Sequence, residues 1–325
     1  MAADFWAQER ANRRQTAALV AVFLVLYCAL GLGLDFLLGA LGFRDGTLQG
    51  FPVLTLAALI VGLIQASVSY YGGAALILAS VHARPLLPDS DRHRMVLDVI
   101  QEMTIAARMP PIKAYVMPDP APNAFATGRD PAHSYICVTQ GLIDQMDREE
   151  LQGVIGHEMA HIRNYDIRTM MMIAVLVGGI ALLADFVYYG GASSDDHDNE
   201  GGNLLLIAVL ILAVLAPILS QLLAMAVSRR REYLADASSV EFTRNPRALT
   251  RALEHLAAIE MPIKNASRGT AHLFIINPLE GNRKEDNEGW LDNLLSTHPP
   301  LRRRIERLRA MGGGAPAAAS ATAQA

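Results

Sequence analysis

Three residues near the middle of the chain have the types and spacing needed to bind and use a metal ion. His157 and His161 flank Glu158 in the segment HEMAH, with the two histidines four positions apart. On a helix, residues at this spacing lie on one face, so both imidazole rings can reach the same ion. Glu158 can then reach a water molecule at that ion and take its proton. The alternative is a solvated helix with two unrelated histidines, and the rest of the sequence has to decide.

The sequence around these residues predicts a helix. Asp147 is a candidate N-cap, and Glu150 follows three residues later, as in a capping box. Gly153 and Gly156 oppose helix formation mildly. Apolar residues nevertheless recur at helical spacing: Leu151, Val154, Ile155, Met159 and Ile162. Because the segment is predicted to be helical, the spacing of four places both histidines on one face, as metal binding requires.

Composition indicates a membrane protein. Hydrophobic residues make up 52% of the chain and charged residues 18%. Four long stretches are almost free of charge: residues 15–34, 46–81 with a span inside 51–80, 169–191 and 201–228. Each reaches the roughly 20 apolar residues that cross a bilayer. A buried helix of a soluble protein explains one such stretch but not four, and the first is too long for a cleavable signal peptide. The sequence therefore predicts four transmembrane helices.

The distribution of arginines predicts the orientation in the membrane. Three arginines precede the first stretch and three more, at 229–231, follow the fourth. The loop over 193–203 is acidic and has no Lys or Arg. The positive-inside rule then places both termini and the central segment, 82–168, on the cytoplasmic side.

The segments outside the membrane predict a mainly α-helical fold with a small β-sheet. Helices are expected over 89–109, from 147 through HEMAH straight into the third span, from 230, over 245–260 and from 299. Strands are expected over 112–117, 123–127 and 134–139. The predicted organisation is 1–84 with two spans, 85–168 with the sheet and the HEMAH helix, 169–228 as a transmembrane hairpin, 229–311 as a second cytoplasmic part, and 312–325 as a disordered tail.

A catalytic zinc ion needs a third protein ligand, and the membrane geometry indicates Glu232. His161 precedes the third span by about eight residues, which on a helix is roughly 12 Å above the bilayer. Glu232 follows the fourth span by about four residues, so the hairpin returns it to a similar height. Asp236 shares its helix face and is expected to hydrogen-bond the far nitrogen of a ligating histidine. Without HEMAH, both residues would be attributed to a solvated helix face.

The charge and the placement of the cysteines give no sign of nucleic-acid binding, of a disulfide or of a cysteine metal site. The net charge of −4, with no basic stripe carrying interleaved aromatic residues, gives no sign of nucleic-acid binding. Cys28 lies in the first span and Cys137 in a predicted strand, so the two cannot pair, and neither has metal-site spacing. Asp35 and Asp185 are expected at the membrane interface rather than in a proton path. Six histidines without partner spacing are expected to be structural or solvated: His82, His93, His133, His197, His255 and His272.

Four segments carry a resemblance to a known family: NAFATG at 123–128, GVIGHEMAHIRNYD at 153–166, SRRREYLADA at 228–237 and THPPLRRRIERL at 297–308. Their order, with two spans between the second and third, resembles the HtpX family of membrane-integrated zinc metalloproteases, relatives of the Ste24 prenyl-protein proteases within the gluzincins. The resemblance covers about residues 15–310, whereas the N-terminus and the acidic loop depart from it. It implies one zinc ion (Zn2+) per chain on His157, His161 and Glu232, with Glu158 as general base and Asp236 bonded to His157.

The resemblance also implies roles beyond the metal ligands. A His-Pro segment near the C-terminus implies transition-state stabilisation by His298 and, six residues on, by Arg304. The segment 123–127 is expected to be an edge strand that pairs with an extended substrate, with the contacts made by Asn123, Ala124, Phe125 and Ala126, and the alternative is an ordinary strand without this role. The implied function is a zinc-dependent endopeptidase of the bacterial cytoplasmic membrane. It would hydrolyse unfolded or damaged membrane proteins from the cytoplasmic side.

Two other functional classes stay open at this point. A non-catalytic membrane chaperone or scaffold could keep the same fold, but it would have no need of Glu158 as a base. A prenyl-protein processing enzyme like the Ste24 proteases would share the metal site. Four predicted spans are too few for the large intramembrane chamber of those relatives, which disfavours this second class.

Overall fold

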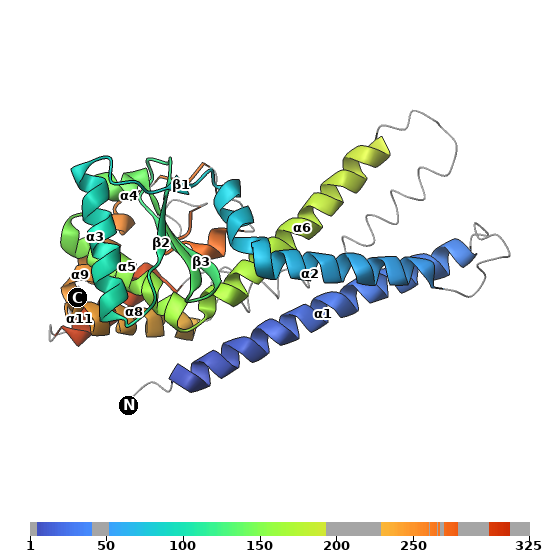
Figure 1. The fold of residues 1–325 in the computed structure, drawn as a ribbon, viewed down its shortest axis with the longest axis horizontal. Helices are drawn as coiled ribbons and strands as arrows, with labels where there is room; N and C mark the ends of the chain where they lie inside the picture. Colours follow the sequence, from blue (N-terminus) through green and yellow to red (C-terminus); the bar gives the residue numbers. More distant parts are fainter. Residues whose placement is uncertain are drawn as a thin grey trace, which may run out of the picture.

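The structure, a computed structural model, describes residues 5–40, 52–192, 229–259, 261–264, 266, 270–278 and 299–312. Within these ranges the chain is mainly helical with one small sheet (Figure 1). The helices are α1 (Phe5–Ala40), α2 (Val53–Ser80), α3 (Asp91–Ala106), α4 (Gln140–Gln145), α5 (Arg148–Arg163), α6 (Asp166–Ala192), α8 (Arg229–Thr243), α9 (Pro246–Ala257), the 3-10 turn η1 (Ala271–Leu273) and α11 (Leu301–Met311). The strands are β1 (Arg84–Pro85), β2 (Lys113–Met117), β3 (Ala124–Asp130) and β4 (His133–Thr139).

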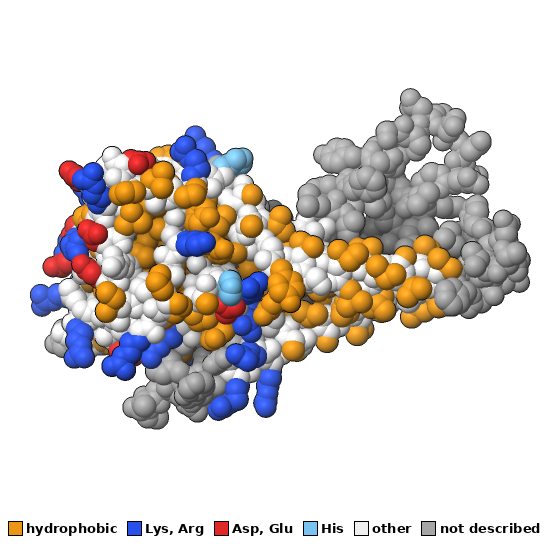
Figure 2. All heavy atoms as spheres, viewed as in Figure 1, with side chains coloured by type: hydrophobic (Ala, Val, Ile, Leu, Met, Phe, Trp, Pro, Cys, Tyr) orange, Lys and Arg blue, Asp and Glu red, His pale blue; other side chains and the backbone are white. Residues whose placement is uncertain are grey.

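Two of the described helices are long and apolar enough to cross a membrane. They are Arg10–Gly33 within α1, and α2. Only 11% of the apolar window of α2 is buried, which differs from the core helix of a soluble protein. Figure 2 shows apolar side chains covering the shaft that α1 and α2 form, whereas charged side chains gather on the globular part. The third predicted span coincides with α6, and the fourth, at 201–228, lies outside the described residues.

Polar side chains tie the first two helices together along the shaft. Tyr27 of α1 donates a hydrogen bond of 2.6 Å to Gln65 Oε1 of α2. Near the far end, Asp35 accepts hydrogen bonds from the backbone N–H groups of Leu54 and Thr55, at 3.1 and 2.9 Å. These are first-turn N–H groups that no residue within α2 can satisfy. Asp35 therefore caps the neighbouring helix, and Asp185 lies where the structure describes no side chain.

The sheet is mixed, with strand order β1-β2-β4-β3. The three predicted strands are all present, and β1, a two-residue strand antiparallel to β2, was not predicted. β2 and β4 run parallel, and β3 and β4 form an antiparallel pair. β3 is at the sheet edge, as the sequence predicted, and this edge lies next to α5 and α6 (Figure 1).

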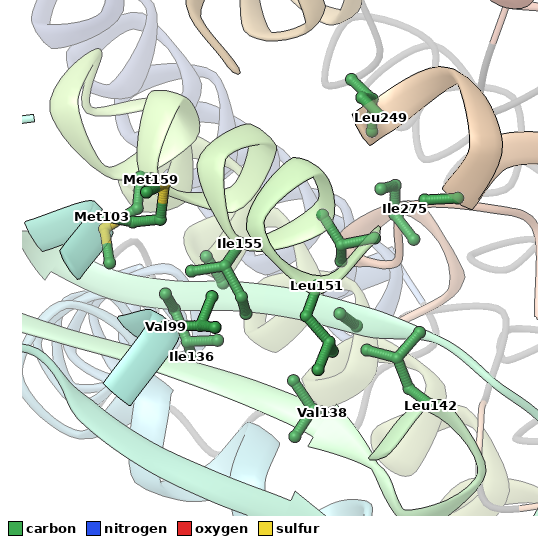
Figure 3. Packing of buried hydrophobic residues seen from close by; sticks show 14 of the residues in the cluster. Val99, Met103, Ile136, Val138, Leu142, Leu151, Ile155, Met159, Leu249 and Ile275 are labelled. Carbon is green, nitrogen blue, oxygen red and sulfur yellow. The ribbon is translucent and has the colours of Figure 1, made fainter. Parts of the chain in front are cut away.

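The helix α5 is the centre of the globular core. Its N-cap Asp147 and Glu150 form the predicted capping box, because each side chain accepts from the other residue's backbone N–H. Ile155 and Met159 pack with residues of α3 and of β4 in one hydrophobic cluster (Figure 3). Every residue from Gly153 to Ile162 is buried. A helix enclosed in this way has little freedom, so it holds its side chains in fixed places.

The two glycines that weaken the helical pattern are needed for packing. A Cβ at Gly153 would lie 2.5 Å from the backbone nitrogen of Leu249 in α9. A Cβ at Gly156 would lie 2.9 Å from Ser239 Oγ in α8. Real Cβ contacts are not this short with a backbone atom, so Gly153 in particular allows α9 to approach α5 closely. Close packing at this position requires glycine, and the lower helix propensity of glycine is a mild cost of it.

Gly153→Ala should therefore destabilise the protein by about 1–3 kcal/mol through overpacking against α9. The melting temperature in detergent should fall by several degrees. Gly72→Ala is the matched control, because a Cβ at this helical glycine meets nothing within 4 Å. A melting temperature for Gly153→Ala at or above that of Gly72→Ala would contradict the packing argument.

One prediction about the helices is wrong. The HEMAH helix does not continue straight into the third span: α5 ends at Arg163 and α6 begins at Asp166. Between them, Tyr165 has a φ of 61°, which a helix cannot accommodate. The break turns the chain four residues after His161. All of the predicted tail at 312–325 except Gly312 lies outside the described residues, as does most of the segment 265–288, whose sequence is rich in Gly and Asn and predicts a loop.

Candidate metal centre

Three candidate metal ligands meet inside the globular part. His157 and His161 project from α5, and Glu232 comes from the first turn of α8. One donor atom from each lies within 4.8 Å of the others. Each histidine Nε2 is 3.6 Å from a carboxylate oxygen of Glu232, and the two Nε2 atoms are 3.2 Å apart. The structure thus brings together the three residues that the sequence singled out as ligands.

The chemistry of this donor set fits a zinc ion. Two imidazoles and one carboxylate are ligands that zinc accepts, and three protein ligands leave a fourth position for water or substrate. Among the described residues, the surroundings also hold excess negative charge, because four buried carboxylates face two buried guanidinium groups: Glu158, Asp166, Glu232 and Asp236, with Arg231 and Arg304. A divalent cation would balance that charge.

A carboxylate stands behind each histidine. Asp236 Oδ1 is 3.0 Å from His157 Nδ1, and Asp166 Oδ2 is 3.1 Å from His161 Nδ1. Since a carboxylate only accepts hydrogen bonds, it holds the proton of each neutral imidazole on Nδ1 and leaves the Nε2 lone pair available. Sequence reasoning anticipated Asp236 and missed Asp166. The available signal was its place in the HEMAHIRNYD segment, five residues after His161.

Arg304 lies beside two of the candidate ligands, His157 and Glu232. Its guanidinium is fully buried and binds Asp236 through two hydrogen bonds of 2.7 and 3.0 Å. A third hydrogen bond reaches the carbonyl oxygen of Ile275, and Nη1 is 3.6 Å from Glu232 Oε2. These contacts orient Asp236, and the transition-state role that the resemblance implies for Arg304 stays a prediction. His298, the other predicted transition-state residue, lies outside the described residues.

Glu158 is buried beside the three ligands with 1% of its surface exposed. Burial raises its pKa to about 7, and the nearby Glu232 carboxylate adds to the rise. His161 and a hydrogen bond from the backbone N–H of Ala126 oppose it. A carboxylate with a pKa near neutrality can both take and return a proton at physiological pH. This is the property that a general base and acid needs.

The two histidines differ in the pKa that the surrounding protein groups give them. Burial lowers the pKa of His157 to about 4, against the opposing effect of Asp236. Burial also lowers the pKa of His161, but Asp166 and Glu232 outweigh it and raise the value to about 9. A cation that binds His161 must therefore displace a proton, whereas His157 already presents a neutral ring.

The predicted substrate strand is partly covered by the chain itself. Ala124 O accepts a hydrogen bond of 3.0 Å from Ile275 N, and Phe125 pairs with Phe274 in an isolated antiparallel bridge. The Asn123 side chain donates to the carbonyl oxygen of Ile276. Asn123 and the three residues after it are at most 2% exposed. An extended substrate would thus find the edge at Ala124 already occupied by the segment 274–276.

Comparison with known proteins decides the family. Residues 87–312 match Peptidase family M48. The chain belongs to this family. Relatives named Protease HtpX homolog include one from Dictyoglomus turgidum (strain DSM 6724 / Z-1310), 39% identical over 310 residues that cover 95% of each chain. Another, from Lactobacillus helveticus (strain DPC 4571), is 38% identical and covers 92% of this chain and 97% of its own.

A more distant likeness is to the crystal structure of S. mikatae Ste24p. It has a TM-score of 0.48 and 16% identity, and covers 94% of this chain and 66% of that chain. These values carry no conclusion about activity. Membership of M48, the HtpX homologues and the two candidate spans make this chain a membrane metallopeptidase, which acts on peptide bonds. The group of His157, His161 and Glu232 is the candidate metal site of this M48 peptidase.

Proposed function

We propose that this M48 peptidase is a zinc-dependent endopeptidase that degrades misfolded or damaged membrane proteins. The observation that carries the proposal is the convergence of His157, His161 and Glu232 directly beside the buried carboxyl group of Glu158. A site that only bound metal would have no use for Glu158. One zinc ion per chain would be held by the three converging residues, through the two Nε2 atoms and the carboxylate.

The chemistry divides between the ion and the protein. When bound, zinc lowers the pKa of a coordinated water and polarises the scissile carbonyl. Glu158 takes the proton of the attacking water and passes it to the leaving amine. Asp236 and Arg304 hold His157 from behind, and His298 is proposed to stabilise the oxyanion as negative charge develops.

The proposed substrate class follows from how an edge strand recognises a peptide. A peptide that takes the place of the segment 274–276 at the edge of β3 would be recognised through its backbone, so little side-chain sequence is required. Only an extended, unfolded segment can bind in this way, and the buried ligands exclude a folded surface. The apolar shaft of α1 and α2 keeps the protease domain at the bilayer, which favours membrane proteins as substrates.

Cleavage of matched folded and unfolded substrates tests this function. Purified protein in detergent, loaded with zinc, should digest casein and a heat-destabilised membrane protein. It should leave the same membrane protein intact when a bound ligand stabilises the fold. Equal cleavage of the folded and destabilised forms would contradict a role in quality control. No cleavage of any substrate by a zinc-loaded sample would contradict endopeptidase activity.

The proposed arrangement has four transmembrane helices in the bacterial cytoplasmic membrane, with both termini and the metal centre inside. The parts 85–168 and 229–311 together form one cytoplasmic protease domain, and the hairpin 169–228 joins them. Contacts of α5 with both α8 and α9 support the union of the two parts. The three arginines at 229–231 and the acidic loop at 193–203 support the orientation.

Reporter fusions test the topology. A periplasmic reporter inserted near Asp196 should be active, and one fused to the C-terminus should be inactive, because only the acidic loop is expected outside. A cytoplasmic reporter at the same two positions should give the reverse pattern. A cytoplasmic signal at Asp196 would contradict both the orientation and the hairpin that returns Glu232 to the ion.

A further inference from the structure

A residue of the first membrane helix reaches the metal centre. Asn12, near the start of α1, donates a hydrogen bond of 2.7 Å to Asp166 Oδ1 and another of 2.6 Å to the carbonyl oxygen of Asn164. Its side chain is buried, with 2% of the residue exposed. An amide nitrogen carries two hydrogens, so both donors of Asn12 are used. The contact is therefore specific, and it joins parts of the chain that are 154 positions apart.

The acceptor of this hydrogen bond is the carboxylate that orients His161. Asp166 directs Oδ2 to His161 Nδ1 and Oδ1 to the amide of Asn12. A carboxylate bonded at one oxygen can still rotate about its own axis, whereas bonds at both oxygens fix its plane. Asn12 thereby sets the direction from which Asp166 holds the imidazole ring, and Arg231 lies 3.9 Å from the same oxygen.

The break between α5 and α6 makes this arrangement possible. On a continuous helix, a residue five positions after His161 would lie about 140° around the axis from it. Asp166 could not then face the ring. The turn at Asn164 and Tyr165, where φ is 61°, brings Asp166 back under His161. Asn12 bonds to Asn164 in the turn and to Asp166 directly after it, so it holds the turn and the carboxylate together.

The position of Asn12 is fixed by the docking of α1 on α6. One helical turn further along, Thr16 hydrogen-bonds to Thr169 at 3.0 Å. Leu19, Phe23 and Tyr27 continue the same face of α1 and pack in one cluster with residues of α6: Met172, Ile173 and Leu176. The contacts advance along both helices in the same direction. Figure 1 shows the N-terminal end of α1 beside the globular part.

We propose that Asn12 is a positioning residue of the metal centre, which acts on His161 through Asp166. Docking of the first membrane helix on α6 brings Asn12 to Asp166, and the hydrogen bond between these two residues is what supports metal affinity. The inference rests on the proposed zinc site of His157, His161 and Glu232. It gives the N-terminal part of α1 a role in the chemistry in addition to anchoring.

Zinc affinity measured by competition with a chromophoric chelator tests this role on the full-length protein in detergent. Asn12→Ala should weaken zinc binding by about tenfold, the lower end of the range for residues that support a metal ligand. Asp166→Ala should weaken it by about 10- to 100-fold. Because Asn12 acts through Asp166, Asn12→Ala added to Asp166→Ala should change the affinity less than about twofold.

Thr16→Val is the matched control, since it removes a docking hydrogen bond on the same face of α1 without touching Asp166. It should lower the melting temperature and leave zinc affinity within about twofold of wild type. Wild-type affinity in Asn12→Ala, an equal loss in Thr16→Val, or additive losses in the double variant would each overturn the inference. Wild-type protein that takes up no zinc would overturn the proposed metal centre itself.

Discussion

Glu158→Gln should lower the rate of proteolysis by about 10²- to 10⁴-fold and leave the zinc content unchanged. Glutamine has nearly the same shape as glutamate, but its amide cannot take a proton from water. Glu158 is not one of the three converging donors, so the metal site keeps its ligands. The measurement is zinc per protein by elemental analysis, together with the initial rate of casein cleavage.

Folding should not limit this experiment. Glu158 is buried close to Glu232, and burial together with that carboxylate raises its pKa to about 7. A neutral amide at this position therefore removes an unfavourable buried charge. Glu150→Gln is the matched control, because it makes the same change in the capping box of the same helix, far from the ligands. Undiminished cleavage by Glu158→Gln would exclude Glu158 as the base.

Local patterns were enough to predict the elements that carry the chemistry. The capping box of Asp147 and Glu150, the apolar repeat behind it and the two strands that became β3 and β4 are all short-range signals. The return of Glu232 to the histidines could also be anticipated, because a transmembrane hairpin restricts where the chain can come back. Asp236 followed from Glu232 by helical spacing alone.

The features that the sequence did not predict depend on contacts between distant segments. Nothing near Tyr165 indicates a positive φ, and an apolar run favoured a continuous helix instead. The role of Asp166 depends on that turn, and the role of Asn12 depends on docking between α1 and α6. Similarly, the contact of Ile275 with Ala124 joins a poorly patterned loop to a strand. Periodicity cannot reveal pairings of this kind.

Zinc content separates the proposed ligand Glu232 from the residues that orient the histidines. Glu232→Ala leaves two histidines, too few for a stable catalytic site, so this variant should retain almost no zinc and no activity. Glu241→Ala is the matched control on the same helix, since the Glu241 side chain is 60% exposed. It should keep zinc and turnover. Full zinc occupancy in Glu232→Ala, with loss of zinc in His298→Ala, would identify His298 as the third ligand.

Asp236→Ala should weaken zinc affinity by about 10- to 100-fold, and Arg304 explains why the loss has two parts. The first is the loss of the hydrogen bond that orients His157. The second is that Arg304, deprived of its partner, remains buried and charged only 3.6 Å from Glu232. An unpaired buried guanidinium will pair with that carboxylate and compete with the metal ion for it.

Removing the guanidinium as well should therefore restore part of the affinity. Asp236→Ala combined with Arg304→Met should bind zinc more tightly than Asp236→Ala alone and melt at a higher temperature, because the buried guanidinium that had lost its partner is gone. Arg304→Met alone should retain zinc, since Asp236 still holds His157. If the double variant bound zinc no better than Asp236→Ala, Arg304 would have no influence on Glu232. The loss would then belong entirely to the orientation of His157.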